Sequence, residues 1–315
     1  MSRKKLKNRR RKDRAQRKIL IAAVCIAAVI IGVGIGGHVI KKNAGKTMTT
    51  AKMESKKAVS KKKETAKKLT INETDASNKE NQGQKDQADD RNEFAVQPGR
   101  KVGTTEQSDE KVVYLTLDDG PSKNTQAVLD ILDKYNAKAT FFVTGAMPEY
   151  KDMIKKAYDK GHTIGMHTYS HDYAKVYASV DAYFQDLDQI GQLVKEEIGY
   201  VPCFIRFPGG SSNTISASYM KGIMTTLTQE VQARGYQYYD WNGSSGDGAV
   251  RTTEQLVNQA TSFHDNNIIL LSHDSETKDT TVEALPKIIE YYQSQGYVFK
   301  ALDLNSYVAH HGVNN

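Results

Sequence analysis

The chain has 315 residues, 38% of them hydrophobic, and a formal net charge of +7 at pH 7. The charge is unevenly distributed: residues 1–68 carry 22 basic and three acidic side chains, whereas residues 69–315 carry 22 basic and 34 acidic ones. The C-terminal part therefore has a net charge of −12 and lacks the concentration of Lys and Arg that nucleic-acid binding requires. We expect no nucleic-acid partner.

The N-terminal segment predicts a membrane anchor. Residues 3–18 contain 11 Lys or Arg and one Asp, and the 22 residues of 19–40 contain no Lys, Arg, Asp or Glu. That length spans a lipid bilayer, and the preceding positive charge favours a cytoplasmic tail (1–18) and an extracellular C-terminal part. A cleaved signal peptide is the alternative, but the apolar stretch is longer than usual and Lys41 and Lys42 follow it directly. We therefore expect a single-pass type II protein of the cell membrane.

Residues 41–108 predict a disordered linker. They are rich in Lys and then in Asn, Gln, Asp and Glu, with almost no aromatic residue and no apolar periodicity. A disordered chain of about 65 residues spans on the order of 45 Å, which would hold a folded domain (109–315) away from the membrane. Cys25 in the predicted span and Cys203 in the domain cannot pair within one chain, so the domain must be stable without a disulfide bond.

From Val112 onward, apolar runs alternate with segments of helical periodicity. The predicted strands are Val112–Leu117, Ala139–Val143, His162–Met166, Cys203–Phe207, Tyr236–Trp241, Asn267–Ser272 and Tyr297–Leu302. The predicted helices are Asn124–Tyr135, Pro148–Lys160, Val180–Ile198, Ser216–Arg234, Thr252–Asp265 and Thr281–Gln295. This alternation predicts an α/β fold with a parallel sheet or barrel, whose functional residues gather at the carboxyl ends of the strands.

Two motifs at predicted strand ends have the composition of a metal site. Asp118 and Asp119 follow the first apolar run, and Gly120 then turns the chain. His167 and His171 are four residues apart, so on a helical turn their imidazoles share one face. Two His and one Asp leave a zinc coordination position open for water, and the second Asp can accept a proton from that water. Each motif alone is more often a plain turn or a surface pair, but their shared location favours the metal site.

Three further clusters end later strands: Arg206-Phe207-Pro208-Gly209-Gly210, then Asp240-Trp241-Asn242 with Asp247, then Leu271-Ser272-His273-Asp274. In order and spacing, the five motifs together resemble the polysaccharide deacetylases of the NodB-homology type, also called carbohydrate esterase family 4. The resemblance covers about residues 111–303. It implies a distorted, incomplete (β/α) barrel with about seven parallel strands.

The resemblance also implies roles for the first two motifs. Asp118 matches the general base of the family. Its three metal ligands match Asp119, His167 and His171. Zn²⁺ is the expected metal, although a site of this kind also accepts Co²⁺, Ni²⁺ or Mn²⁺.

The remaining motifs match residues around the reacting group. Arg206 matches the arginine that pairs with the base, and His273 matches the general acid; a structural ion pair and a satisfied core histidine are their alternatives. Leu271 matches the apolar residue that shapes the acetyl pocket. Gly209 stands where many members have Tyr and keeps the backbone N–H that faces the oxyanion. Trp241 fits either a core position or a platform for a sugar ring.

The fourth motif departs most from the family pattern. The family's Asp-x-x-x-Trp falls on Ser244 and Gly248, so neither expected side chain is present. Asp240 or Asp247 would then tune His273, and the sequence leaves both open. Met166 precedes His167 where Asn is common, which removes one hydrogen bond near the ligands.

These observations predict a monomeric, membrane-anchored, extracellular and metal-dependent N-deacetylase. Its expected substrate is peptidoglycan N-acetylglucosamine, because a surface-tethered enzyme with a long linker meets cell-wall glycan first. The alternatives are deacetylation of chitin-like oligomers, poly-N-acetylglucosamine or acetylated xylan, a catalytically silent glycan-binding module, and a structural wall-tethering protein.

Overall fold

The computed structural model describes residues 90–314 of the chain. The predicted basic tail (1–18), membrane span (19–40) and most of the linker lie outside the described residues. Within residues 90–314, no helix combines the length and the apolar character needed to cross a membrane.

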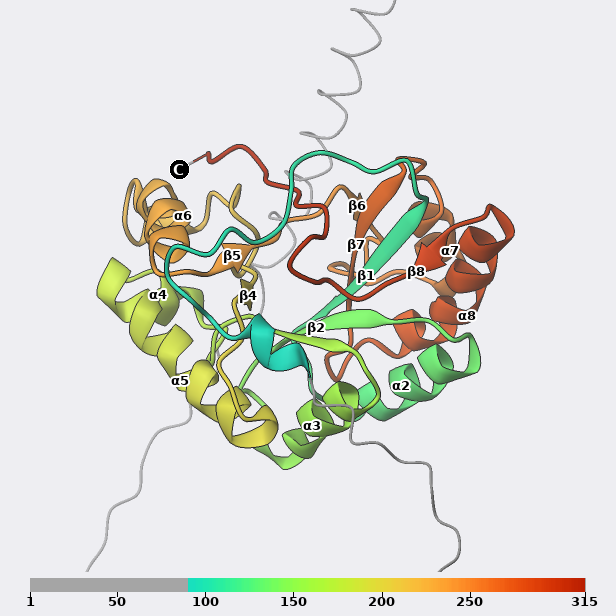
Figure 1. The fold of residues 1–315 in the computed structure, drawn as a ribbon, viewed down its shortest axis with the longest axis horizontal. Helices are drawn as coiled ribbons and strands as arrows, with labels where there is room; N and C mark the ends of the chain where they lie inside the picture. Colours follow the sequence, from blue (N-terminus) through green and yellow to red (C-terminus); the bar gives the residue numbers. More distant parts are fainter. Residues whose placement is uncertain (1–89, 315) are drawn as a thin grey trace, which may run out of the picture. The chain divides into compact units, whose positions relative to one another are not determined.

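Eight parallel strands form one open sheet in the order β5-β4-β3-β2-β1-β7-β6, with β8 paired to the first residues of β1 (Figure 1). The strands are β1 (Val112–Asp118), β2 (Ala139–Val143), β3 (Thr163–Met166), β4 (Phe204–Ile205), β5 (Gln237–Tyr238), β6 (Gly243–Ser244), β7 (Asn267–His273) and β8 (Val298–Phe299). The expected α/β fold with an incomplete barrel of parallel strands is confirmed. Each predicted strand region holds a strand, whereas β6 was not predicted.

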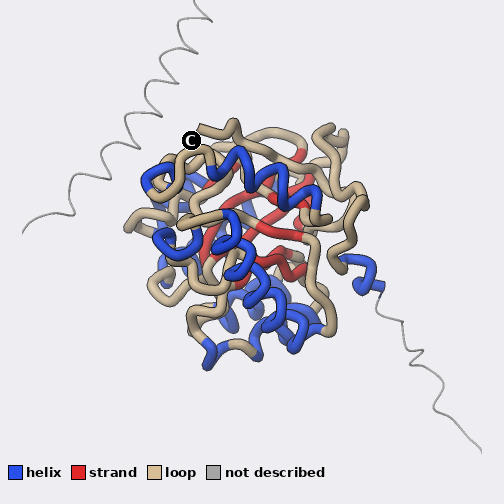
Figure 2. The backbone as a smooth tube through the Cα atoms, turned by 90° about the vertical axis from the view of Figure 1, so that its left-hand side faces the viewer, coloured by secondary structure: helices blue, strands red, loops and turns tan. Residues whose placement is uncertain are grey.

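Helices surround the strands on the outside (Figures 1 and 2). The α-helices are α2 (Thr125–Lys134), α3 (Asp152–Asp159), α4 (Tyr173–Val176), α5 (Val180–Ile198), α6 (Ile223–Ala233), α7 (Thr253–Ala260) and α8 (Asp279–Ser294). Short 3₁₀ turns are η1 (Asp90–Phe94), η2 (Pro148–Tyr150) and η3 (Ser216–Ser218).

The limits of two predicted helices show how local chemistry sets them. The helix predicted over Val180–Ile198 is confirmed at both ends as α5. It begins after Ser179 because the Ser179 hydroxyl accepts a hydrogen bond from the Ala182 N–H, and it ends before Gly199 because that glycine has a left-handed φ of 93°. The single helix predicted over Ser216–Arg234 was wrong. It is split into η3 and α6, and Gly222, with a φ of 75°, precedes α6.

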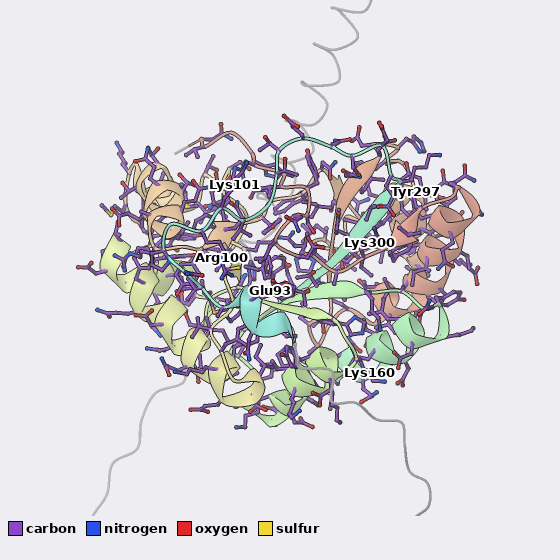
Figure 3. The ribbon with its side chains drawn as sticks, viewed as in Figure 1. Glu93, Arg100, Lys101, Lys160, Tyr297 and Lys300 are labelled. Carbon is purple, nitrogen blue, oxygen red and sulfur yellow. The ribbon has the colours of Figure 1, made fainter. Side chains whose placement is uncertain are left out.

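Residues 90–108 belong to the folded part, so the predicted linker was wrong for this segment. Phe94 is buried, and its ring meets the ring of Phe204 edge to face at a centroid distance of 5.2 Å. Arg100 donates hydrogen bonds to the Glu93 carbonyl and to a nearby glutamine side chain (Figure 3). The segment also closes against the end of the chain through a bridge between residues 104 and 307.

The strand register brings the chemically distinctive residues to one edge of the sheet. Asp118, the last residue of β1, lies opposite His273, the last residue of β7. The paired ends of β3 and β4 are followed directly by His167 and Arg206. All of these residues therefore sit at the carboxyl ends of neighbouring parallel strands.

The seven residues of the central strand, β1, are all buried, which predicts that its side chains contribute strongly to stability. Leu115→Ala is expected to lower the free energy of unfolding by about 2–5 kcal/mol, because it leaves a cavity between sheet and helices. Chemical denaturation of purified protein measures this. Val250→Ala is the control, since Val250 is 106% exposed and should change stability little. Equal stability of the two variants would contradict the assignment of β1 to the centre of the core.

Candidate active site

Asp119, His167 and His171 bring one potential ligand atom each to within 4.8 Å of one another. The Asp119 Oδ1 atom lies 3.5 Å from Nε2 of His167 and 3.3 Å from Nε2 of His171. This oxygen is buried and has no hydrogen-bond partner among the described residues. A carboxylate oxygen without a partner, facing two imidazole nitrogens, fits the ligand set of a divalent cation. The three predicted ligands thus converge as expected.

His167 is held in the form that binds a metal. Its Nδ1 donates a hydrogen bond of 2.8 Å to the carbonyl oxygen of Arg206, which leaves the lone pair of Nε2 facing Asp119. Burial, together with the neighbouring His171, lowers the pKa of His167 to about 3. The ring is therefore neutral at ordinary pH.

The backbone around these side chains adopts unusual conformations. Asp119, Thr168 and His171 have positive φ values of 69°, 81° and 50°. Such values cost free energy in residues other than glycine and cluster at functional sites. The turn between the two histidines is stabilised by Asp186, which accepts hydrogen bonds from the N–H groups of residues 169 and 170 at 2.6 and 2.9 Å.

Sequence reasoning missed Asp186. It lies in the middle of α5, between the buried residues Tyr183 and Ile190, and is itself fully buried. A carboxylate on the apolar face of a predicted helix needs hydrogen-bond donors from another element. That position was the signal that could have identified it.

Asp118 is paired with Arg206, as predicted. Nη1 of Arg206 donates to Oδ1 of Asp118 at 2.8 Å and to the Thr116 hydroxyl at 2.7 Å. The same guanidinium donates to the main-chain carbonyls of Tyr239 and Asp240 and lies over the ring of a phenylalanine. Burial raises the pKa of Asp118 above its ordinary value, and the charge of Arg206 opposes this rise. A carboxylate with a raised pKa is a better proton acceptor than a free one.

The structure distinguishes between the two candidate partners of His273. Asp247 accepts hydrogen bonds from Nδ1 of His273 at 2.8 Å and from its backbone N–H at 2.7 Å. Asp240 instead accepts from Ser211 and from the backbone N–H of His311. Burial disfavours the charged ring of His273, but Asp247 and the nearby carboxylates outweigh it and raise its pKa to about 9.

The three remaining predicted residues lie on or after strands β4, β5 and β7. Gly209 has a φ of 75° in the turn after β4. Leu271 lies two residues before His273 on β7, so the two side chains share a face of the sheet. Trp241 is partly buried, and its ring lies over Arg206 at 5.7 Å and edge-on to His311 at 4.7 Å.

Comparisons with known proteins match this geometry. Residues 105–226 match the family described as polysaccharide deacetylase. A putative polysaccharide deacetylase of Bacillus subtilis is 30% identical over 212 residues, which cover 65% of this chain and 71% of that protein. The chain belongs to the polysaccharide deacetylase family.

Further relatives of this deacetylase carry more specific names. A peptidoglycan-N-acetylglucosamine deacetylase of Bacillus cereus is 32% identical over 202 residues, covering 61% of this chain and 69% of the relative. The crystal structure of the catalytic domain of a peptidoglycan N-acetylglucosamine deacetylase from Eubacterium rectale has 46% sequence identity and a TM-score of 0.65, and the match covers 67% of this chain and 97% of that one. The chain is thus a hydrolase of carbohydrate esterase family 4.

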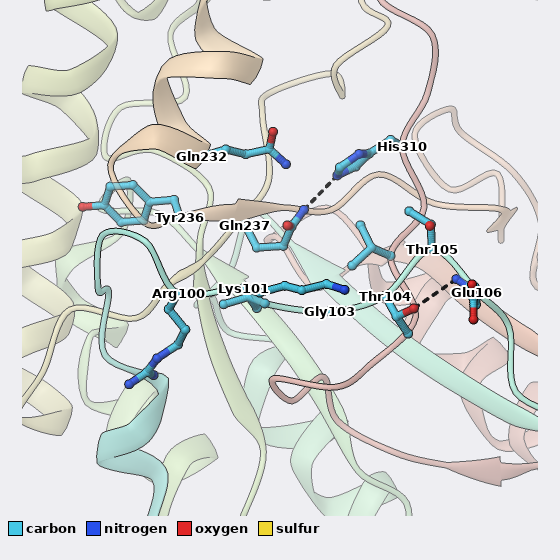
Figure 4. A pocket seen from close by; sticks show the side chains of 12 residues that line it. Arg100, Lys101, Gly103, Thr104, Thr105, Glu106, Gln232, Tyr236, Gln237 and His310 are labelled. Atoms are coloured by element: carbon cyan, nitrogen blue, oxygen red, sulfur yellow. Dashed lines mark hydrogen bonds between the residues drawn. The ribbon is translucent and has the colours of Figure 1, made fainter.

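The deacetylase also has a separate cavity of about 570 Å³ (Figure 4). It lies beside the amino end of β5 and is lined by Lys101, Gln237 and His310, among others; the last two are joined by a hydrogen bond of 2.8 Å. It shares no residue with the cluster of aspartates and histidines, which sits at the carboxyl ends of the strands.

The contact between Asp247 and His273 predicts a histidine pKa that depends on one carboxylate. In the metal-free deacetylase, Asp247→Asn is expected to lower the pKa of His273 from about 9, because it removes the negative charge that stabilises the imidazolium. Proton NMR titration of the imidazole resonances measures it. Asp240→Asn serves as the control and should leave this pKa nearly unchanged. A larger shift in the control would contradict the assigned partner.

Proposed function

We propose that this deacetylase removes acetyl groups from peptidoglycan N-acetylglucosamine in a metal-dependent reaction. The observation that carries the proposal is the convergence of Asp119, His167 and His171, whose ligand atoms lie within 4.8 Å of one another. They lie between the buried carboxylate of Asp118 and the partly buried ring of His273. This arrangement offers a cation site, a proton acceptor and a proton donor at one edge of the sheet.

The metal would be held by these three side chains. A bound divalent cation would polarise the acetamide carbonyl and lower the pKa of a water molecule. Zn²⁺ suits a set of two imidazoles and one carboxylate, and Co²⁺, Ni²⁺ and Mn²⁺ are the alternatives. The neutral state of His167 and the unpaired oxygen of Asp119 support this assignment.

Asp118 is the proposed general base. Arg206 occupies its Oδ1 atom, whereas its Oδ2 atom lies 3.8 Å from Nε2 of His167 and so faces the ligand cluster. That oxygen is placed to accept a proton from the attacking water. The hydrogen bond from Arg206 fixes the orientation of the Asp118 carboxylate.

His273 is the proposed general acid. Its Nδ1 is committed to Asp247, so the opposite nitrogen, Nε2, points toward the cluster and lies 4.0 Å from Oδ2 of Asp119. The ion pair with Asp247 favours the protonated ring, which can give its proton to the amide nitrogen as the C–N bond breaks. Water and the acetamide are thereby converted to acetate and a free amine.

The remaining predicted residues have proposed roles in binding. The Gly209 N–H would stabilise the negative charge that develops on the carbonyl oxygen, Leu271 would line the site of the acetyl methyl group, and Trp241 would support a sugar ring. The names of the Bacillus cereus and Eubacterium rectale relatives favour peptidoglycan as the polymer.

We also propose the cellular setting from the sequence. The 22 uncharged residues of 19–40 would anchor a monomeric protein in the cell membrane, with the basic tail inside and the deacetylase domain outside. Residues 41–89 would then act as the linker that lets the domain reach cell-wall glycan.

The test is acetate release by the purified full-length chain from bacterial peptidoglycan. Release is expected, is expected to stop when a chelator removes the metal, and is expected to return when Zn²⁺ is restored. Chitin-like oligomers, poly-N-acetylglucosamine and acetylated xylan are assayed in parallel. If acetate is released faster from one of these polymers than from peptidoglycan, that polymer is the preferred substrate and the proposed substrate is wrong. Acetate release that persists in the chelator would contradict the proposed dependence on a metal.

A further inference from the structure

The peptide bond between Pro208 and Gly209 is central to the proposed reaction. Its N–H is the group assigned to the developing oxyanion. Its carbonyl points the opposite way, because the bond is not among the cis peptides of the described residues. Whatever holds the carbonyl therefore also aims the N–H.

Tyr177 holds that carbonyl. Its hydroxyl donates a hydrogen bond of 2.7 Å to the carbonyl oxygen of Pro208. Tyr177 is the C-cap residue that follows α4 and is fully buried, and its ring packs edge to face against Tyr173 at 5.5 Å. A hydrogen bond to a peptide carbonyl restricts rotation of the peptide plane and polarises the N–H of the same unit, which makes that N–H a stronger donor.

The backbone N–H of Gly209 is the group that this residue can present to a ligand. A Cβ atom at this position would lie 2.5 Å from the Tyr173 hydroxyl oxygen and 3.1 Å from Cβ of Asn213, so a side chain here would require Tyr173 to move. Across residues 90–314, no hydrogen bond from the Gly209 N–H is formed, whereas the next N–H, of Gly210, donates to the Phe207 carbonyl at 2.8 Å. The N–H is thus available to a ligand.

We infer that Tyr177 is a positioning residue for the deacetylation reaction, which orients and polarises the Pro208–Gly209 peptide so that the Gly209 N–H stabilises the oxyanion. This inference rests on the proposed function, because it requires an acetamide carbonyl in the site. Tyr177 itself does not touch the substrate. Its effect should appear in the transition state, where charge develops on the carbonyl oxygen, and not in substrate binding.

Tyr177→Phe in the full-length chain tests the inference, with Tyr292→Phe as a matched control. Tyr292 is also fully buried, and its hydroxyl also donates to a main-chain carbonyl, that of Ala260, at 2.7 Å, but on α8. Tyr177→Phe is expected to lower kcat for acetate release at least about tenfold, with KM and Zn²⁺ affinity unchanged. The control should lose comparable stability and keep its kcat.

A kcat for Tyr177→Phe equal to that of the control would overturn the inference, as would a loss expressed only in KM. If Tyr177→Phe does not fold, 3-fluorotyrosine at position 177 provides the second variant, because it keeps the ring and makes the hydroxyl a stronger donor. Its kcat should then exceed that of the wild type, and an unchanged kcat would contradict the inference. Failure of the wild-type chain to release acetate would instead contradict the proposed function, so the two failures are distinguishable.

Discussion

The rest of the site depends on the pairing of the buried Arg206 guanidinium with its hydrogen-bond acceptors. The side chain is fully buried, and its donors reach Asp118 on β1 and the two carbonyls that follow β5. A buried guanidinium is tolerated only when it is paired, and removing one partner costs about 3–5 kcal/mol. The backbone carbonyl of Arg206 also holds His167. One residue therefore ties the proposed base to a proposed metal ligand.

The pairing with Arg206 gives the two adjacent aspartates, Asp118 and Asp119, different surroundings. Asp118, the proposed base, is the last residue of β1 and is paired with Arg206. Asp119 has left the strand with a φ of 69°, and its carboxylate faces His167 and His171. Asp247 orients His273 in a similar way, since it accepts a hydrogen bond from Nδ1 and leaves Nε2 free for its proposed role as proton donor. Each proposed reacting group thus has a second residue that orients it, and Tyr177 would serve the Gly209 peptide in the same way.

Sequence patterns predicted the features that are encoded locally. The apolar run before Asp118, the extent of α5 and the strand-end positions of the ligands could all be read in this way, because burial and turn chemistry act over a few residues. β6 was missed because Gly243–Ser244 lies in no apolar run, and α4 was missed because four residues are too few to show a helical period. The choice between Asp240 and Asp247 could not be made, since one lies at the end of the fifth predicted strand and the other in the loop just after it, and only the tertiary fold decides which one reaches β7.

The central claim is that the two neighbouring aspartates have different tasks, and metal content measures this most directly. Zn²⁺ bound per chain is determined after dialysis for the wild type, Asp119→Ala and Asp118→Asn, alongside acetate release. The structure predicts one Zn²⁺ in the wild type, none in Asp119→Ala, and one in an Asp118→Asn protein that has lost activity. Retention of Zn²⁺ by Asp119→Ala, or its loss from Asp118→Asn, would contradict the assignment of ligand and base.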